Sequence, residues 1–263
     1  MKKLIIITLM SLTFSSNYVS ADSAEDKGLQ IANEVDRHDQ GWVDTSTSMK
    51  MVLRNRQGDE SVREIRIKSL EVDSNGDGDK SLTIFDTPAD VKGTSFLSYS
   101  HTITPDDQWL YMPALKRVKR INSANKSGPF MGSQFAYEDL ASFEVDKYKY
   151  KYIKDDSLNN IDTFIVENYP QYQHSGYTRQ LVWIDKIRYI PIKIEYYDRK
   201  NMLLKTLLFN EYKQYLDKYW RAHTQSMENH QNGKTTLLTF IDYQFKNGYS
   251  EKDFNRNSLK RSR

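Results

Sequence analysis

The sequence predicts a mainly β protein built on a large antiparallel sheet, curled or closed, with few helices. Over most of the chain, apolar and polar side chains alternate with a period of two, and turn sequences recur at short intervals. The 263 residues include 18 tyrosines but only 6 prolines and 11 glycines. Aromatic residues favour half-buried, pleated surfaces. A regular succession of short strands and turns is typical of all-β barrels and sandwiches.

The first 21 residues have the pattern of a cleavable secretory signal peptide. Lys2 and Lys3 precede an apolar run, and Val19-Ser20-Ala21 offers the small residues that a signal peptidase admits. The apolar run is about half the length that a membrane anchor needs, roughly 20 residues. The chain has no cysteine, which excludes a lipid-modified cysteine, a disulfide and a thiolate metal site. We therefore expect a mature protein that begins at Asp22 and lies in the periplasm without a lipid anchor.

The charge balance excludes two classes of partner. The formal net charge is +3, and it includes Lys2 and Lys3 of the signal. A nearly neutral mature chain predicts neither nucleic acid nor an anionic membrane as the main partner. No later stretch is long and apolar enough to span a bilayer, so stable membrane insertion is not expected. The basic residues 259–263 are expected to form a solvated tail.

The mature chain is expected to be one domain, residues 22–263, because no repeat, linker or shift in composition divides it. It begins with a predicted helix, Ser23–Arg37. Ser23 is placed to cap this helix, with Asp26 at the capping-box position. Leu29, Ala32 and Val35 recur at helical spacing, and the helix should end near Gly41.

After Gly41 the period changes to two, which predicts strands. Turns such as Gln57-Gly58-Asp59 and Asn232-Gly233 separate them into hairpins. The clearest alternation is at 147–152, where tyrosine alternates with lysine. The predicted strands are 49–54, 63–67, 82–85, 94–99, 108–112, 117–122, 147–152, 162–168, 179–184, 192–197, 203–212, 222–228 and 235–245.

One segment, residues 123–140, interrupts the strand pattern. It contains Gly128-Pro129-Phe130-Met131-Gly132-Ser133, which is too long for a hairpin turn and too apolar for a simple solvated loop. Long loops in compact domains are often lids or binding loops. The alternative is a plug of core residues under the sheet, and the sequence favours neither. Phe130, Met131 and Phe135 are the candidates to close a cavity from this segment.

The sequence predicts no catalytic residue, metal or cofactor. The acidic turn Asp73–Asp79 resembles the start of a calcium loop, but Ile84 stands where a bidentate glutamate is needed, so we interpret it as a hairpin turn. The histidines form no metal-binding motif, and no G-x-S-x-G or phosphate-binding glycine loop occurs. We therefore do not expect an enzyme. The five histidines are His38, His101, His174, His223 and His230.

A curved sheet with many apolar inward positions could enclose a greasy ligand. Methionine suits such a cavity because its thioether adapts to irregular shapes. The alternative is that the same side chains fill a dry core. The candidate cavity residues, taken from the early strands, are Met49, Met51, Leu53, Ile65, Ile67, Leu82, Ile84, Trp109 and Tyr111.

Three segments carry a resemblance to a known family: 85–94, 107–121 and 128–140, whose sequences are FDTPADVKGT, DQWLYMPALKRVKRI and GPFMGSQFAYEDL. In this order and spacing they resemble the LolA-like outer-membrane lipoprotein-sorting family. The similarity is to the longer branch found beside exporters of the RND or MMPL type. The resemblance covers roughly residues 28–260.

The resemblance implies an incomplete, half β-barrel whose open side is covered by helices around an apolar cavity. It also implies carriage of a lipid or lipoprotein acyl chain across the periplasm without catalysis, with an inner-membrane exporter of RND or MMPL type as a possible partner. The alternative function is an accessory or interaction module of such an exporter, with a dry core and no lipid carriage. An enzyme acting on a lipid or an envelope polymer would need a perturbed carboxylate or histidine beside the cavity.

Overall fold

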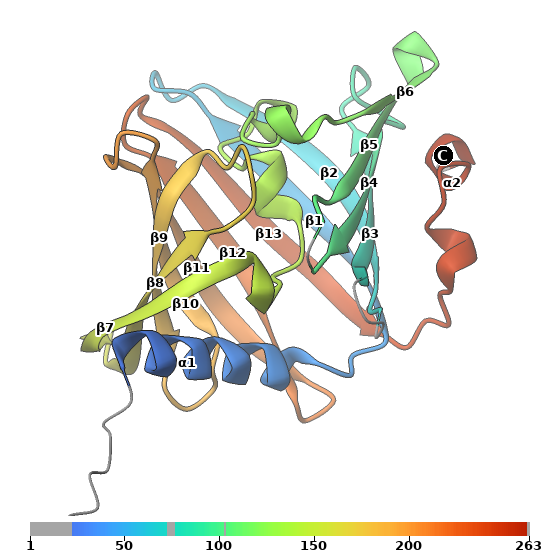
Figure 1. Ribbon diagram of the computed structural model, residues 1–263. Helices are drawn as coiled ribbons and strands as arrows, with labels where there is room; N and C mark the ends of the chain where they lie inside the picture. The colour runs from blue at the N-terminus through green and yellow to red at the C-terminus, as the bar shows by residue number, and fades with distance from the viewer. Residues whose placement is uncertain (1–22, 73–76, 103, 262–263) are drawn as a thin grey trace, which may run out of the picture.

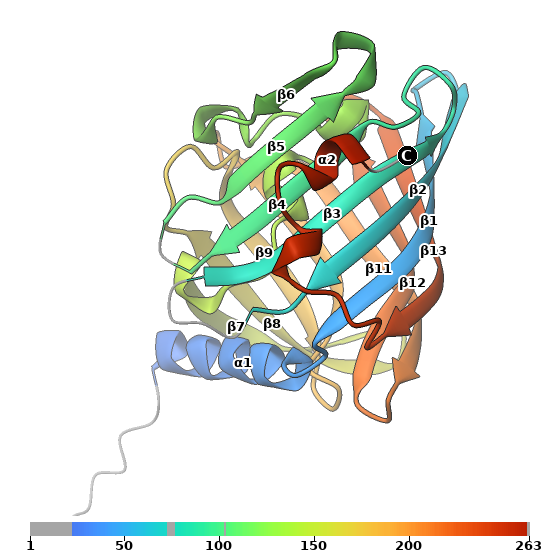
Figure 2. The same ribbon diagram turned by 90° about the vertical axis from the view of Figure 1, so that its right-hand side faces the viewer.

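The fold is a single antiparallel sheet of thirteen strands that curls into a half-barrel (Figures 1 and 2). The computed structural model describes residues 23–72, 77–102 and 104–261. The predicted signal peptide 1–21, the new N-terminus Asp22 and residues 73–76 of the acidic turn lie outside these ranges. The observed fold confirms the predicted class, a mainly β half-barrel with few helices.

Each of the thirteen predicted strands is present, with ends that differ by a few residues. The longest gap between strands contains only short 3-10 turns between residues 123 and 147. The helices and strands are α1 (Ala24–Asp39), β1 (Asp44–Arg54), β2 (Glu60–Leu70), β3 (Asp77–Thr87), β4 (Ser95–His101), β5 (Asp107–Met112), β6 (Arg117–Arg120), β7 (Tyr148–Leu158), β8 (Ile161–Pro170), β9 (Tyr177–Asp185), β10 (Pro191–Asp198), β11 (Leu203–Tyr215), β12 (Tyr219–Asn229), β13 (Lys234–Phe245) and α2 (Ser258–Arg261).

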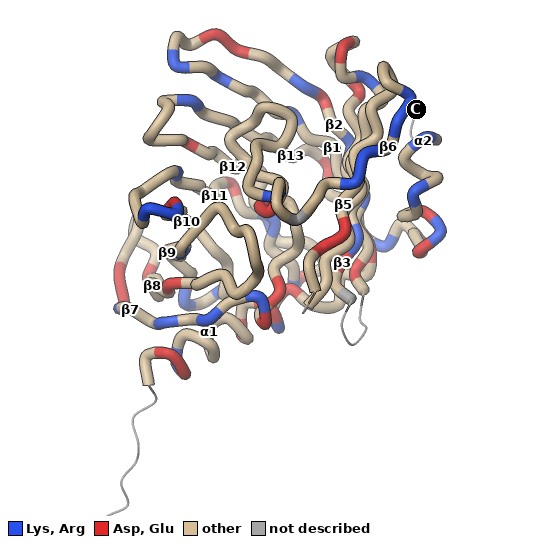
Figure 3. Tube along the Cα trace, turned by 45° about the horizontal axis from the view of Figure 1, so that its top comes forward, with Lys and Arg blue, Asp and Glu red and all other residues tan. Residues whose placement is uncertain are grey.

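The strand order follows the chain in two halves. Strands β1 to β6 extend the sheet in one direction and β13 back to β7 extend it in the other, and the β1–β13 pair joins the halves. The sheet therefore ends at β6 and β7. Figure 3 shows Lys and Arg along β6, and β7 carries Lys149, Lys151 and Lys154. Charged side chains on edge strands discourage pairing with another chain.

Helix α1 packs against β7 and covers one end of the half-barrel (Figure 1). The predicted capping box is confirmed, because Asp26 N donates to Ser23 Oγ over 3.0 Å and Ser23 N donates to Asp26 Oδ2 over 3.3 Å. Ile31 and Ala32 are buried, whereas Leu29 is 43% exposed. At Gly28 the helix approaches the sheet so closely that a Cβ would lie 2.8 Å from the Tyr152 backbone nitrogen. Only glycine permits this distance.

The inner face of the sheet packs on residues 123–147, which we call the plug segment. Phe130 and Phe135 are buried, at 1% and 3% exposure, in one cluster with Met49, Met51 and Ile65. The cluster extends across both halves of the sheet. The plug segment therefore lies along the concave side of the half-barrel (Figure 1), and its last residues, Val145–Lys147, contact α1.

The outer face of β2 to β5 is covered by the C-terminal segment, residues 249–261 (Figure 2). Phe254 and Leu259 are fully buried there against Leu82 and Trp109. Ser95 Oγ also donates to the Leu259 carbonyl oxygen over 2.7 Å. The expectation of a solvated tail from residue 259 is thus wrong at Leu259, because an apolar surface on the outside of the sheet receives it.

Candidate functional site

A cavity of about 1550 Å³ lies on the concave side of the sheet. It extends from Phe135 and Asp139 of the plug segment to α1 and the turns beside it. Pockets that hold small ligands measure about 300–1,000 Å³, so this cavity has room for a larger, apolar molecule. Its apolar wall comes from β8 to β13 and includes Val166, Val182, Ile184, Ile194, Phe209 and Phe240.

At the plug end, a buried ion pair fixes the wall. Lys205 of β11 lies 2.5 Å from Asp139, and their side chains are only 4% and 2% exposed. Tyr177 OH donates to Asp139 Oδ1 over 2.8 Å, and Lys205 Nζ lies 4.9 Å from the centre of the Tyr196 ring. Charges buried this deeply need a partner and further hydrogen bonds, and Asp139 has both.

Two further buried groups hold the plug segment. Glu138 accepts hydrogen bonds from Tyr172 OH, Ser175 Oγ and Gly176 N over 3.0, 2.8 and 2.8 Å. Burial is the main cause that raises the pKa of the Glu138 carboxyl. Asp106 forms ion pairs with Lys126 and Lys147, both from the plug segment. The segment is thus tied to the sheet at three places and forms a plug in this structure.

The three predicted loop residues lie in or beside this plug. Phe130 and Phe135 are buried in the inner cluster, and Phe135 also lines the cavity. Met131 is partly buried, and its carbonyl oxygen accepts a hydrogen bond from Arg63 Nη1 over 2.6 Å. That these side chains cap a ligand stays a prediction.

The nine candidate cavity residues divide between the two faces of the sheet. Met49, Met51, Leu53, Ile65 and Ile67 belong to the inner cluster, and of the nine only Ile67 lines the cavity. The remaining four pack in the outer cluster beneath Phe254 and Leu259 and therefore do not share a space with the first five: Leu82, Ile84, Trp109 and Tyr111.

The physical reason is that β3 to β5 are covered on both faces. In β3, Phe85 points inward opposite Ile65, whereas its neighbour Ile84 points outward. When both faces are apolar, a period of two cannot show which one is inside. Contact between any of these residues and a ligand stays a prediction.

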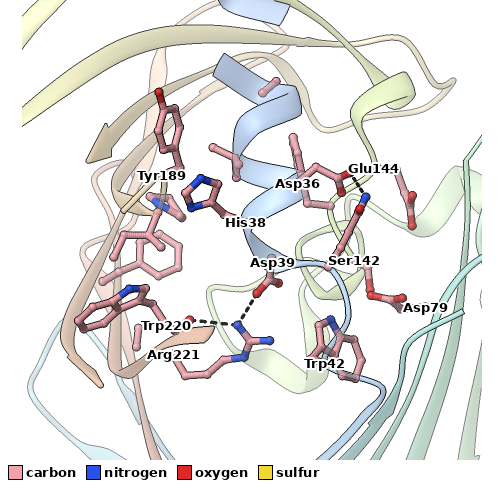
Figure 4. Close-up of a pocket in the computed structure, with 18 of the residues that line it drawn as sticks. Asp36, His38, Asp39, Trp42, Asp79, Ser142, Glu144, Tyr189, Trp220 and Arg221 are labelled. Carbon is pink, nitrogen blue, oxygen red and sulfur yellow. Dashed lines mark hydrogen bonds and ion pairs between the residues drawn. The ribbon is translucent and has the colours of Figure 1, made fainter. Parts of the chain in front are cut away.

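The rim of the cavity beside α1 is acidic on one side. Asp36, Asp79 and Glu144 lie on that side (Figure 4). Burial raises the pKa of Asp79 to about 6 and that of Glu144 to about 7, and it also raises the pKa of Asp36. Repulsion adds to the shift of Glu144, because Asp79 and Asp36 are close enough to act on it. These residues lie far apart in the sequence, so no local pattern could have identified the group.

Two arginines at the same cavity are paired with aspartates. Arg221 lies 2.5 Å from Asp39, as Figure 4 shows, and Arg188 lies 2.6 Å from Asp185. Lys218 Nζ donates to the Gln40 carbonyl oxygen. The carboxyl groups of Asp36, Asp79 and Glu144, in contrast, form no ion pair within 4.0 Å among the residues that the structure describes. The acidic side of the rim is partly compensated, because the positive charge of Lys147 acts on Glu144 and lowers the pKa of that carboxyl.

Within residues 23–72, 77–102 and 104–261, no group of His, Asp and Glu is arranged to hold a metal ion. Across those same ranges, no helix has the length and apolarity needed to span a membrane.

Among the histidines, His223 is buried, with Nδ1 2.9 Å from the Phe240 carbonyl oxygen. This contact orients the ring within the sheet.

Comparison with protein-family models shows that residues 77–261 match a family described as an uncharacterized protein. Comparison with the curated proteins gives no match.

Several solved structures share the fold. A domain from Vibrio parahaemolyticus assigned to outer membrane lipoprotein sorting is 60% identical, with a TM-score of 0.88, over 90% of this chain and 100% of that one. A DUF1329 family protein from Desulfovibrio piger is 28% identical with a TM-score of 0.85, again over 90% of this chain and 100% of the other. A LolA superfamily protein from Nitrosomonas europaea is 20% identical with a TM-score of 0.69 over the same shares, which shows a common fold.

Proposed function

Because the chain belongs to the LolA-like outer-membrane lipoprotein-sorting family, we propose that it is a periplasmic carrier for a lipid or for the acyl chain of a lipoprotein. The observation that carries this proposal is the cavity of about 1550 Å³, which has an apolar wall on the concave face of the sheet. The Vibrio parahaemolyticus relative, assigned to lipoprotein sorting, supports the same class of cargo.

Carriage follows from the energetics of the cavity wall. Each methylene group moved out of water gains about 0.8 kcal/mol, so one long acyl chain supplies on the order of 10 kcal/mol before the costs of ordering. The ion pairs around the plug segment close one end of the half-barrel. Cargo would therefore enter and leave beside α1. No catalytic step is part of the proposal.

The cargo is proposed to pass between envelope components, with an exporter of RND or MMPL type as one partner. That partner rests on the sequence resemblance alone. The alternative, an accessory module with a dry core, predicts no connected apolar space, so the cavity favours the carrier.

The test uses two neighbouring residues on opposite faces of β11. Phe209 lines the cavity and is half-buried, whereas Leu208 points outward and is 40% exposed. We expect Phe209→Asn to weaken the binding of a fluorescent fatty-acyl probe at least about tenfold. Water in the cavity can solvate the new amide, so the unfolding midpoint should fall only slightly.

The matched control Leu208→Asn should leave probe binding unchanged. Equal losses in the two variants would place the probe elsewhere on the protein. If the unmodified protein bound no probe, and if native mass spectrometry of protein taken from its own periplasm found no co-purifying lipid, the carrier function would be refuted.

A further inference from the structure

The hairpin formed by β5 and β6 carries a dense group of positive charges at one edge of the sheet. Residues 116–120 read KRVKR, so four of the five are basic and none is acidic. All four side chains are exposed, and Figure 3 shows Lys and Arg along β6. This run belongs to the segment 107–121 that carries the family resemblance, yet no residue of that segment lines the cavity. The proposed carriage of cargo therefore does not explain it.

Three of these four cations are without an ionic partner. Arg120 is paired with Asp107. Lys116, Arg117 and Lys119 form no ion pair within 4.0 Å among the residues that the structure describes. Neighbouring charges of one sign repel each other, so their concentration in the free protein is unfavourable. A negatively charged partner would remove this repulsion.

The C-terminal segment extends the positive charge onto the outer face of the sheet. Helix α2 contacts β4 and β5 (Figure 2), and Arg256 and Lys260 of this segment are exposed. The guanidinium carbon of Arg256 lies 5.8 Å from the centre of the Trp109 ring, and Trp109 stands opposite Arg120 in the register of β5 and β6. We call the whole group the basic edge: Lys116, Arg117, Lys119, Arg120, Arg256 and Lys260.

An apolar side chain is exposed at the tip of the same hairpin. Leu115 is 58% exposed and directly precedes Lys116. The turn is well defined, because the Lys116 backbone nitrogen donates to the Pro113 carbonyl oxygen over 3.0 Å. Cations beside an exposed apolar residue suit an anionic bilayer, where lysine and arginine meet phosphate groups and leucine enters the boundary between headgroups and acyl chains. An acidic protein surface would match the charges but would offer no apolar layer to Leu115.

We propose that the basic edge docks the protein on the surface of a negatively charged lipid bilayer, with Leu115 in the headgroup region. The contact is peripheral and lies outside the cavity, so it goes beyond the proposed carrier function and does not depend on it. The hairpin lies away from α1 in both views of the fold (Figures 1 and 2), so docking does not cover that helix. The net charge of the chain gave no sign of this surface, because it does not report how charges are distributed.

The experiment measures sedimentation of the mature protein with vesicles in about 50 mM salt. We expect binding to vesicles of phosphatidylethanolamine and phosphatidylglycerol, and little binding to pure phosphatidylcholine. One Lys or Arg near an anionic surface strengthens adsorption about fivefold. The triple variant Lys116→Gln/Arg117→Gln/Lys119→Gln should therefore weaken binding on the order of a hundredfold. Binding should also weaken steeply as the salt concentration rises, because salt screens exposed charges.

The matched control removes the same charge from the other edge strand. Lys149, Lys151 and Lys154 of β7 are exposed as well. Lys149→Gln/Lys151→Gln/Lys154→Gln should weaken vesicle binding less than about threefold. Because all six substitutions are at exposed positions, both triple variants should keep the unfolding midpoint of the unmodified protein.

A second readout places Leu115 in the bilayer. The tryptophan of Leu115→Trp should lose fluorescence on vesicles that contain brominated phosphatidylglycerol. The unmodified protein should lose much less, because its own tryptophans lie outside the hairpin tip. Equal quenching in the two proteins would contradict entry of this residue into the headgroup region.

The remaining outcomes distinguish docking from other causes. Equal losses in the two triple variants would overturn the basic edge, because only net charge would then act. Binding to polyglutamate without binding to vesicles would also overturn the proposal, in favour of an acidic protein partner. If Phe209→Asn lost vesicle binding as well, the cavity and not the edge would hold the lipid. Failure of docking leaves the carrier function intact, since that function is tested with a soluble acyl probe.

Discussion

The buried pair of Asp139 and Lys205 gives the sharpest test of whether the plug segment is a fixed part of the fold. In Lys205→Met the carboxylate of Asp139 stays 2% exposed with only Tyr177 OH and Ala136 N as donors. Removing one partner of a buried ion pair typically lowers the free energy of unfolding by about 3–5 kcal/mol. That is a large fraction of the roughly 5–15 kcal/mol that stabilises an ordinary domain.

The measurement is urea unfolding followed by tryptophan fluorescence, with the slope m compared between variants. Lys154→Met is the matched control, because Lys154 is 61% exposed and lies 3.7 Å from Asp156. Exposed ion pairs contribute about 0–1 kcal/mol, so Lys154→Met should change the free energy of unfolding very little. The double variant Asp139→Asn/Lys205→Met should recover much of the loss, since no buried charge remains.

The pH dependence adds an independent check. In Lys205→Met, burial without a neighbouring cation penalises the charged form of the Asp139 carboxyl. The loss of unfolding free energy in Lys205→Met, relative to the unmodified protein, should therefore become smaller as the pH falls from 7 to 4. If Lys205→Met cost no more than Lys154→Met, the plug segment would not be held by this pair and the reasoning would be refuted.

Three further predictions concern α1, the acidic rim and the C-terminal segment. Gly28→Ala should lower stability by about 1–3 kcal/mol despite its better helix propensity, because its Cβ would meet the Tyr152 nitrogen; faster hydrogen exchange across α1 would show the cause. Asp79→Asn should raise the free energy of unfolding by up to about 3 kcal/mol at pH 8 and by nothing at pH 3, since a pKa raised to about 6 in the fold penalises the charged form; an equal gain at both pH values would contradict this. Leu259→Ala should cost about 2–5 kcal/mol in urea unfolding, whereas Lys260→Ala, on an exposed neighbour, should change it by less than about 0.5; equal effects would contradict burial of the segment.

The two-residue periodicity was enough to predict the strands, because each hairpin is formed by residues that lie close together in the sequence. The alternation of tyrosine and lysine in β7, for instance, follows from one buried and one wet face. The capping of α1 by Ser23 and Asp26 is local too, and the structure confirms it. The order of the strands also follows the chain, so the class of fold could be predicted without tertiary information.

The site could not be predicted in the same way, because its parts meet only in the folded chain. Ile84 looks equivalent to Ile65 in the sequence, but the C-terminal segment covers the outside of β3 and buries Ile84 there. Nothing in the sequence of β3 indicates that another segment covers its outer face. Likewise Asp36, Asp79 and Glu144 come from a helix, a strand and a loop, and only the curl of the sheet and the placement of α1 bring them to one rim.

The two ends of the half-barrel differ in how they use buried charge, and this difference fits a carrier that exchanges cargo at one end. At the plug end, the buried charges of Asp139 and Lys205 neutralise each other. At the α1 end, burial raises the pKa of Asp79 and of Glu144, so their charged forms make the protein less stable above pH 7 than at acidic pH.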